Sequence, residues 1–235
     1  MTAHTGPLDA AQEAMRKAQC VLLDFDGPIC DIFAGLPAPR VAASLRSFLA
    51  EHDVEIPPEV EAIEDPLAVF RFSRQLGPDM SRITRDMLTR LEVEAVQTAR
   101  PTPGAADLIR QSKRLGKAVA VVSNNSTMAV TAYLQRTHLG EEIDYVSARV
   151  EPDPNLMKPD PHLVRHALER LAVKPSASVL VGDSETDMEV CKATGVVAVG
   201  YANRPGKASR LEAAGADHVV TSMTELLVTN STETR

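Results

Sequence analysis

One short segment near the N-terminus constrains the fold more than any other. The apolar run 20–23 leads directly into two acids, Asp24 and Asp26, which Gly27 and Pro28 follow. Four consecutive apolar residues are typical of a strand that is buried on both faces of a parallel sheet, and open α/β sheets bind ligands outside the carboxyl ends of their strands. Buried carboxylates without a partner are costly. The segment is therefore either an ordinary acidic turn, which Gly and Pro favour, or the edge of a cation site.

The chemistry of two acids favours a hard cation if the segment is a site. Carboxylate oxygens are ligands that suit Mg²⁺. An Asp carboxylate can also act as a nucleophile, because some enzymes form aspartyl-phosphates. This segment taken alone leaves both interpretations open.

The pattern after the acidic segment first becomes helical. From Pro37 to Ala99 apolar residues recur at helical spacing and no convincing strand is present. Asp65 followed by Pro66 is typical of an N-cap and a first helical residue. This part of the chain is expected to form a small helical unit.

The rest of the chain alternates between strands and helices, which is typical of a doubly wound parallel sheet. Further strands are expected at 118–122, 145–148, 178–181, 196–199 and 218–220. We therefore expect an α/β fold in which residues 1–32 and 100–235 form the core. A small all-α cap domain, residues 33–99, is inserted into it.

Polar residues follow three of the expected strands, and a lysine lies in a loop between two strands. They are Asp24 and Asp26, Ser123 and Asn124, Asp183 and Asp187, and Lys158. The carboxyl ends of parallel strands face the same way, so these groups can converge on one crevice. A hydroxyl, an ammonium and a helix N-terminus can hold a phosphate, and carboxylates can hold the Mg²⁺ that clamps it. The set makes chemical sense as a phosphoryl-transfer site.

Four ordered segments resemble the motifs of the haloacid dehalogenase superfamily. They are Asp24-Phe25-Asp26-Gly27, Ser123-Asn124, Lys158-Pro159-Asp160 and Gly182-Asp183-Ser184-Glu185-Thr186-Asp187. The helical insertion after the first motif is similar to that of the phosphoglycolate phosphatase and β-phosphoglucomutase branch. The resemblance extends from about Cys20 to Thr221.

The resemblance implies a role for each acid. Asp24 would be the nucleophile that takes the phosphoryl group. Asp26 would protonate the leaving group and then activate water, and its main-chain carbonyl would reach the metal. Asp183 would complete the Mg²⁺ site, so that Asp24, Asp26 and Asp183 are the expected metal ligands. Asp187 would support the metal's waters or hold Lys158.

The resemblance also implies a phosphate site. Ser123, Asn124 and Gly27 are expected to bind the phosphate, and Lys158 would neutralise both the nucleophile and the transferring group. Ser184 is expected to brace the carboxylates or to cap the next helix, and both roles are compatible.

The function expected from this resemblance is a Mg²⁺-dependent phosphatase that acts on a small phosphate ester through an aspartyl-phosphate. A phosphomutase of the β-phosphoglucomutase type would use the same residues and is the first alternative. A non-catalytic binding or regulatory protein on the same fold is the second. Only Pro28 favours it, because the family usually has Thr or Val there, and Pro lacks an N–H donor.

Composition limits the partners and the compartment. The net charge of −7 argues against nucleic-acid binding, and no apolar stretch has the length of a bilayer span. The N-terminus lacks the pattern of a signal peptide, and three widely spaced cysteines indicate neither a disulfide framework nor a zinc site. A cytoplasmic monomer or weak homodimer is expected.

Several other residues have an ordinary interpretation that is favoured over a functional one. His162 and His166 are spaced four apart on one expected helix, where a partly solvated face is favoured over a metal site. Arg71 is expected on a solvated face of a cap helix. Asn203 and Arg204 are expected in an ordinary loop after the fifth strand.

Overall fold

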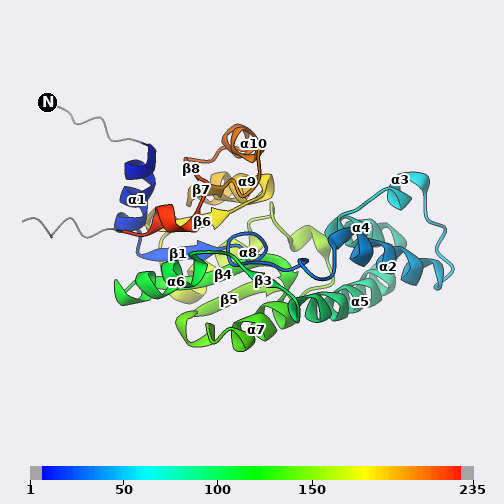
Figure 1. Cartoon of the computed structure of the whole chain (residues 1–235). Coiled ribbons are helices and arrows are strands. Elements are labelled where there is room, and N and C mark those ends of the chain that lie inside the picture. The colour runs from blue at the N-terminus through cyan, green and yellow to red at the C-terminus, as the bar shows by residue number, and fades with distance from the viewer. Residues whose placement is uncertain (1–6, 229–235) are drawn as a thin grey trace, which may run out of the picture.

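The computed structural model describes residues 7–228 and contains one six-stranded parallel sheet with the strand order β5-β4-β1-β6-β7-β8. The sheet strands are β1 (Cys20–Leu23), β4 (Ala118–Ser126), β5 (Tyr145–Arg149), β6 (Ser178–Gly182), β7 (Val197–Tyr201) and β8 (His218–Val220). The predicted apolar run is the buried strand β1, and it lies between β4 and β6 in the middle of the sheet. The predicted doubly wound parallel sheet is confirmed (Figure 1).

Helices cover both faces of this sheet. On β1, Val21 and Leu23 join one hydrophobic cluster, whereas Cys20 and Leu22 join the cluster on the opposite face. The first face is covered by α1 (Pro7–Lys17), α6 (Ala105–Arg114) and α7 (Thr127–Arg136), and the second by α8 (His162–Leu171), α9 (Glu185–Thr194) and α10 (Lys207–Ala214). Alternation of apolar side chains along a strand that is buried on both faces produces these two layers.

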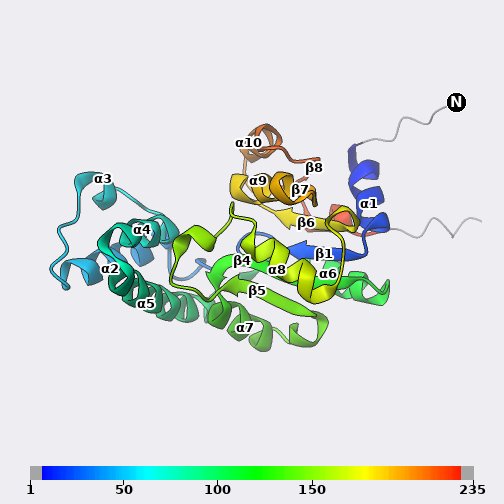
Figure 2. The ribbon, with the colours of Figure 1, turned by 180° about the vertical axis from the view of Figure 1, so that it is seen from behind.

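Four helices form a separate group at one end of the sheet (Figures 1 and 2). They are α2 (Ala38–Ala50), α3 (Pro58–Glu61), α4 (Pro66–Ser73) and α5 (Pro78–Val96). Three of them, α2, α4 and α5, enclose a third hydrophobic cluster that includes Leu45 and Phe70. As predicted, Asp65 caps α4, with its side chain accepting the Leu67 N–H at 2.9 Å. We refer to residues 33–99 as the cap; their division from the core at these bounds stays a prediction.

The chain enters and leaves the cap through two short strands that pair with each other. These strands, β2 (Cys30–Asp31) and β3 (Arg100–Pro101), are antiparallel. The C-terminal end of α5 packs on the core, because Ala95 and Val96 are buried in the hydrophobic cluster that α1, α6 and α7 cover. The last turns of α5 are therefore fixed on the core.

The remaining helical elements are single 3₁₀ turns in the connections. They are η1 (Arg74–Leu76), η2 (Gly140–Glu142), η3 (Pro154–Leu156), η4 (Pro175–Ala177) and η5 (Met223–Leu226). Among the described helices, none combines the length and the apolar character that a bilayer crossing requires.

Candidate active site

Three adjacent strands, β4, β1 and β6, bring three of the four predicted motifs to one end of the sheet, and the loop between β5 and α8 brings Lys158 there. Gly27 adopts φ +97°, and a Cβ at this position would lie 2.4 Å from the Cγ of Asp183. Gly182 is equally constrained, since its Cβ would lie 2.3 Å from that of Asp187. Only glycine permits these contacts. The close approach of the first motif to the fourth therefore depends on Gly27, and Gly182 lets the Asp187 side chain lie against the backbone of its own motif.

Lys158 lies at the centre of the site and is 1% exposed. Its Nζ lies 3.0 Å from Asp24 Oδ1 and 2.6 Å from Asp187 Oδ1, and it donates to the Val122 carbonyl at 2.9 Å. Burial opposes the charge on Lys158, but Asp187 and Asp24 outweigh burial and hold the pKa of this lysine above its usual value. The ammonium is therefore a fixed positive charge beside the predicted nucleophile.

Burial controls the protonation of the two acids of the first motif. It raises the pKa of Asp24 to about 7, although Lys158 acts in the opposite direction and Asp187 adds to the rise. It raises the pKa of Asp26 to about 8, while the Ile32 N–H, which donates to Asp26 Oδ1 at 3.1 Å, opposes the rise. A carboxyl group that retains its proton near neutral pH has the property required of a general acid.

The residues present fit a small divalent cation. Asp24, Asp183 and Asp187 each offer a carboxylate oxygen, and these oxygens lie within 4.8 Å of one another. Burial also raises the pKa of Asp183, against the effect of Lys207. Like charges held so close are relieved by a cation with oxygen ligands. The oxygen donors and the excess negative charge of these three carboxylates therefore suit a cation such as Mg²⁺.

The three carboxylates are not equivalent. Asp187 is fully buried and both its oxygens are engaged, one by Lys158 and the other by Ser184, which donates from its backbone N at 3.1 Å and from Oγ at 2.6 Å. Ser184 also caps α9 through a capping box with Asp187. The Asp26 carboxylate lies outside the three-carboxylate group formed by the described residues. Its predicted metal contact is through the main chain and stays a prediction, as do the other predicted site roles.

Pro28 lies in a tight turn that closes the acidic segment. The Phe25 carbonyl accepts the N–H groups of Ile29 at 3.2 Å and Cys30 at 3.1 Å, and Gly27 N donates to the Cys30 carbonyl at 2.7 Å. The turn is therefore closed by its neighbours without a donor from Pro28.

The second motif lies inside β4, which extends four residues beyond the predicted strand end at 122. Asn124 Oδ1 accepts the Lys158 N–H at 2.7 Å, and its Nδ2 donates to the Lys158 carbonyl at 3.2 Å. Ser123 Oγ accepts the Asn125 N–H and donates to the Asn125 side chain, both at 3.2 Å. The second motif and the lysine loop are therefore held together through backbone and side-chain hydrogen bonds.

A cavity of about 530 Å³ opens over these groups and contacts both the core and the cap. Its lining includes most of the predicted catalytic, phosphate-binding and metal residues, namely Asp24, Asp26, Ser123, Asn124, Lys158, Asp183 and Ser184. From the cap, Arg71 also lines it and donates to the Lys158 carbonyl at 2.8 Å. The interpretation of Arg71 as a solvated surface residue is thus wrong. Helical periodicity alone does not show which polar face of α4 turns toward the core.

Asn203 is also more than a loop residue. Its Nδ2 donates to Asp183 Oδ2 at 3.1 Å, and Lys207 forms an ion pair with the same oxygen.

Sequence reasoning missed Lys207 as well as the buried residues Glu92, Asn125 and Arg149. The available signal for Glu92 was a charged residue between Leu91 and Val93, on the face of the helix that Leu88 and Ala95 define.

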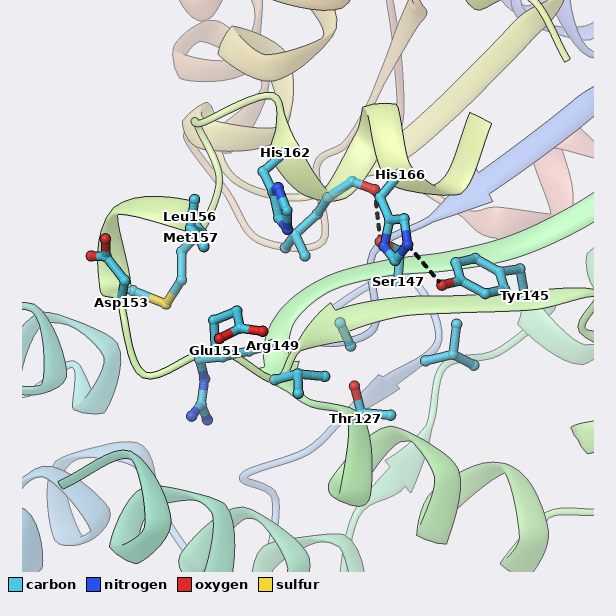
Figure 3. A pocket seen from close by; sticks show the side chains of 14 residues that line it. Thr127, Tyr145, Ser147, Arg149, Glu151, Asp153, Leu156, Met157, His162 and His166 are labelled. Carbon is cyan, nitrogen blue, oxygen red and sulfur yellow. Dashed lines mark hydrogen bonds between the residues drawn. The ribbon is translucent and has the colours of Figure 1, made fainter. Parts of the chain in front are cut away.

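A second cavity of about 350 Å³ lies along β5 and α8 (Figure 3). His162 and His166 line it with their rings stacked 6.1 Å apart, and His166 Nε2 lies 3.3 Å from the Tyr145 hydroxyl. Among residues 7–228 the histidines join no group with metal-ligand geometry. Arg149 points away from both histidines in this view.

Comparison with known proteins identifies the family. Residues 18–195 match the family described as haloacid dehalogenase-like hydrolase. The chain belongs to this family. A phosphoglycolate phosphatase of Cupriavidus necator is 35% identical over 226 residues, which cover 93% of this chain and 86% of the relative. A phosphoglycolate phosphatase of Synechococcus elongatus is 30% identical over 77% of this chain and 82% of its own length.

Solved structures of this hydrolase family share the fold. CbbY from Rhodobacter sphaeroides, crystallised in complex with phosphate, is 25% identical with a TM-score of 0.63, covering 89% of this chain and 96% of its own. A HAD phosphatase from Thermococcus onnurineus, 21% identical, gives a TM-score of 0.59 over 88% of this chain and 95% of its own. The predicted family and its branch are confirmed, as is the prediction that this hydrolase is a phosphohydrolase.

Proposed function

We propose that this hydrolase is a Mg²⁺-dependent phosphatase that cleaves a small phosphorylated metabolite through phosphorylated Asp24. One observation carries the proposal. Asp24 and Lys158, whose ammonium Asp187 holds at 2.6 Å, line a cavity together with Asp26 and Asp183. A nucleophile, an acid and a fixed positive charge therefore meet where a phosphate ester can enter.

The first step is a displacement at phosphorus. A carboxylate oxygen of Asp24 forms a bond to phosphorus while the bond from phosphorus to the ester oxygen breaks. The proton of Asp26 passes to the leaving oxygen, which departs as an alcohol. Lys158 offsets the negative charge of the nucleophile and of the transferring group.

The second step returns Asp24 to its starting state. Asp26, now a carboxylate, takes a proton from a water molecule that attacks the same phosphorus, and the bond from phosphorus to Asp24 breaks. Inorganic phosphate leaves and Asp26 is protonated again. When bound at Asp24, Asp183 and the Asp26 carbonyl, Mg²⁺ would neutralise charge on the phosphoryl oxygens.

The substrate proposal rests on Arg71. It reaches the cavity from the cap, where a guanidinium can pair with a carboxylate of the substrate. Several relatives are named phosphoglycolate phosphatase, and phosphoglycolate carries such a carboxylate. We therefore propose that the substrate is a small phosphorylated carboxylic acid. The phosphomutase alternative stays open and predicts isomerisation of a sugar phosphate without net phosphate release.

The cysteines bear on the compartment in which the enzyme would act. Its three cysteines are free and buried, which suits a reducing cytoplasm. It would act there as a monomer or weak homodimer on a small molecule.

Metal dependence tests the proposal directly. Phosphate release from p-nitrophenyl phosphate and from phosphoglycolate should require Mg²⁺ and stop in excess EDTA. Ca²⁺ should not replace it, because the site offers few ligands and Mg²⁺ requires tighter octahedral geometry. Full turnover in EDTA would contradict the metal proposal, and no release from any phosphate ester with Mg²⁺ would contradict the phosphatase itself.

Arg71→Leu should separate substrate binding from chemistry. Loss of a charge-assisted hydrogen bond to a substrate carboxylate raises the KM for phosphoglycolate by about 10- to 100-fold. The KM for p-nitrophenyl phosphate, which lacks that group, should change by less than about 3-fold. Arg74→Leu is the matched control, since Arg74 is exposed, pairs with Asp153 at 3.5 Å and is outside the cavity lining. Equal effects of Arg71→Leu on both substrates would contradict the substrate proposal.

A further inference from the structure

A fully buried acid on the cap helix α5 contacts the strand that carries the second motif. Glu92 is 0% exposed and lies where the cap cluster, with Leu88 and Leu91, meets the core cluster, with Ala95 and Val96. A charged residue in such surroundings is costly unless it is paired and hydrogen-bonded. The groups that pair with Glu92 therefore indicate its structural role.

Both carboxylate oxygens of Glu92 are used. Oε2 accepts the Ser126 N–H at 2.9 Å and pairs with Arg149 Nη2 at 2.6 Å, and Oε1 accepts from Asn125 Nδ2 at 3.2 Å. The Arg149 side chain is 2% exposed and donates from Nε to the Asn124 carbonyl at 3.0 Å. The guanidinium also lies over the Phe70 ring of the cap, 5.1 Å from its centroid. Glu92 and Arg149 thus hold three consecutive residues, 124–126.

These three residues need such contacts because the strand pairing is interrupted there. Ser123 pairs with Ala148, and the next paired position on β4 is Ser126, opposite Arg149. Asn124 and Asn125 are therefore extra residues that the ladder to β5 does not hold, as in a bulge that redirects side chains near a site. Both line the cavity that opens over Asp24 and Lys158, which we call the catalytic cavity, together with Ser123.

We propose that Glu92 is a positioning residue that fixes the phosphate-binding bulge of β4 through its ion pair with Arg149. The inference rests on the proposed phosphatase function and adds a residue that none of the four motifs contains. Glu92 reaches no reacting atom. It acts through Asn125 and Ser126, and because it belongs to α5, the phosphate site is partly built by the helix that returns from the cap.

A double replacement separates positioning from stability. Replacing a buried ion pair by apolar residues of similar size is often neutral or stabilising for folding. Glu92→Met with Arg149→Met should therefore fold, but the bulge loses the acceptor for Ser126 N and the donor to the Asn124 carbonyl. We expect its dissociation constant for inorganic phosphate, measured by calorimetry with Mg²⁺ present, to rise by about 10-fold or more.

A conservative variant and a structural control complete the experiment. Glu92→Gln keeps the shape and one acceptor, so an intermediate rise in the phosphate dissociation constant is expected. The half-saturating Mg²⁺ concentration should stay within about 2-fold, because the three carboxylates follow β1, follow β6 and lie on α9, outside the bulge of β4. Leu88→Ala removes a buried side chain one turn before Glu92; it should lower the thermal unfolding midpoint and leave phosphate binding unchanged.

The outcomes distinguish the inference from the function on which it rests. Wild-type enzyme that neither binds phosphate nor releases it from an ester would refute the phosphatase proposal. An active wild type with a folded double variant that binds phosphate equally well would overturn the role of Glu92 alone. Weakened phosphate binding in both Glu92 variants but not in Leu88→Ala would support it.

Discussion

Asp24→Asn should abolish turnover and prevent any covalent adduct, whereas Asp26→Asn should accumulate phosphorylated Asp24. Removing the nucleophile leaves no group to take the phosphoryl, so we expect a loss of about 10⁴-fold or more. Asp26→Asn retains the nucleophile and loses proton transfer, which typically contributes about 10²–10⁴-fold. With p-nitrophenyl phosphate, whose leaving group needs little protonation, the first step still proceeds, while water attack lacks its base.

The measurements are intact mass and the nitrophenol burst after rapid mixing. Asp31→Asn is the control, because Asp31 is an exposed neighbouring acid outside the catalytic cavity, and it should resemble the wild type. A burst from Asp24→Asn would show that the two carboxylates have exchanged roles. So would a folded Asp26→Asn enzyme that turns over slowly without an adduct.

Lys158→Met should remove both activity and a large part of the stability. The substitution leaves Asp24 and Asp187 buried without the ammonium that lies 3.0 and 2.6 Å from them. Breaking a buried pair on one side costs about 3–5 kcal/mol of unfolding free energy. The expected readouts are urea unfolding of metal-free protein and phosphate release with Mg²⁺.

The loss of stability in Lys158→Met should depend on pH. In the wild type the folded pKa of Asp24, about 7, is above its unfolded value of about 3.9, so Asp24 contributes stability at low pH that is lost as pH rises through 7. Lys158 lowers that pKa, so its removal raises it further and extends the loss to higher pH. The stability deficit of the variant should therefore be larger at pH 8 than at pH 5.

A surface pair provides the comparison for Lys158. Lys113 lies 2.5 Å from Asp144, and their side chains are 27% and 33% exposed. Lys113→Met should cost less than about 1 kcal/mol. If Lys158→Met cost no more than Lys113→Met, or if its deficit were larger at pH 5 than at pH 8, the ammonium would not hold the two acids together.

Local patterns sufficed for the fold and for most of the candidate site. The strand 20–23 was predictable because four apolar residues end in a polar turn, and the helix after Asp65 because the N-cap precedes Pro66. It was also predictable that the motifs lie close together, because the carboxyl ends of parallel strands lie at the same end of a sheet. Each of these inferences depends on neighbours in the sequence or on a general rule of sheet topology.

The missed contacts join residues that are distant in the sequence. Arg71 and Lys158 are 87 residues apart, Glu92 and Arg149 are 57 apart, and Lys207 and Asp183 are 24 apart. No periodicity encodes these pairs, because they depend on how the cap and the last helices lie on the sheet. The interruption of strand pairing at Asn124 and Asn125 is equally invisible, since an apolar run followed by polar residues predicts only that the strand ends.

The pairing of β2 with β3 bears on how such a cap can be exchanged during evolution. Because the two strands lie side by side, any inserted segment whose ends meet at Cys30–Asp31 and Arg100–Pro101 leaves the sheet connections intact. Glu92 limits this freedom, since a graft that replaced all of α5 would remove the acid that contacts Ser126. A chimeric enzyme with a new specificity should therefore keep the last turns of α5 as part of the recipient.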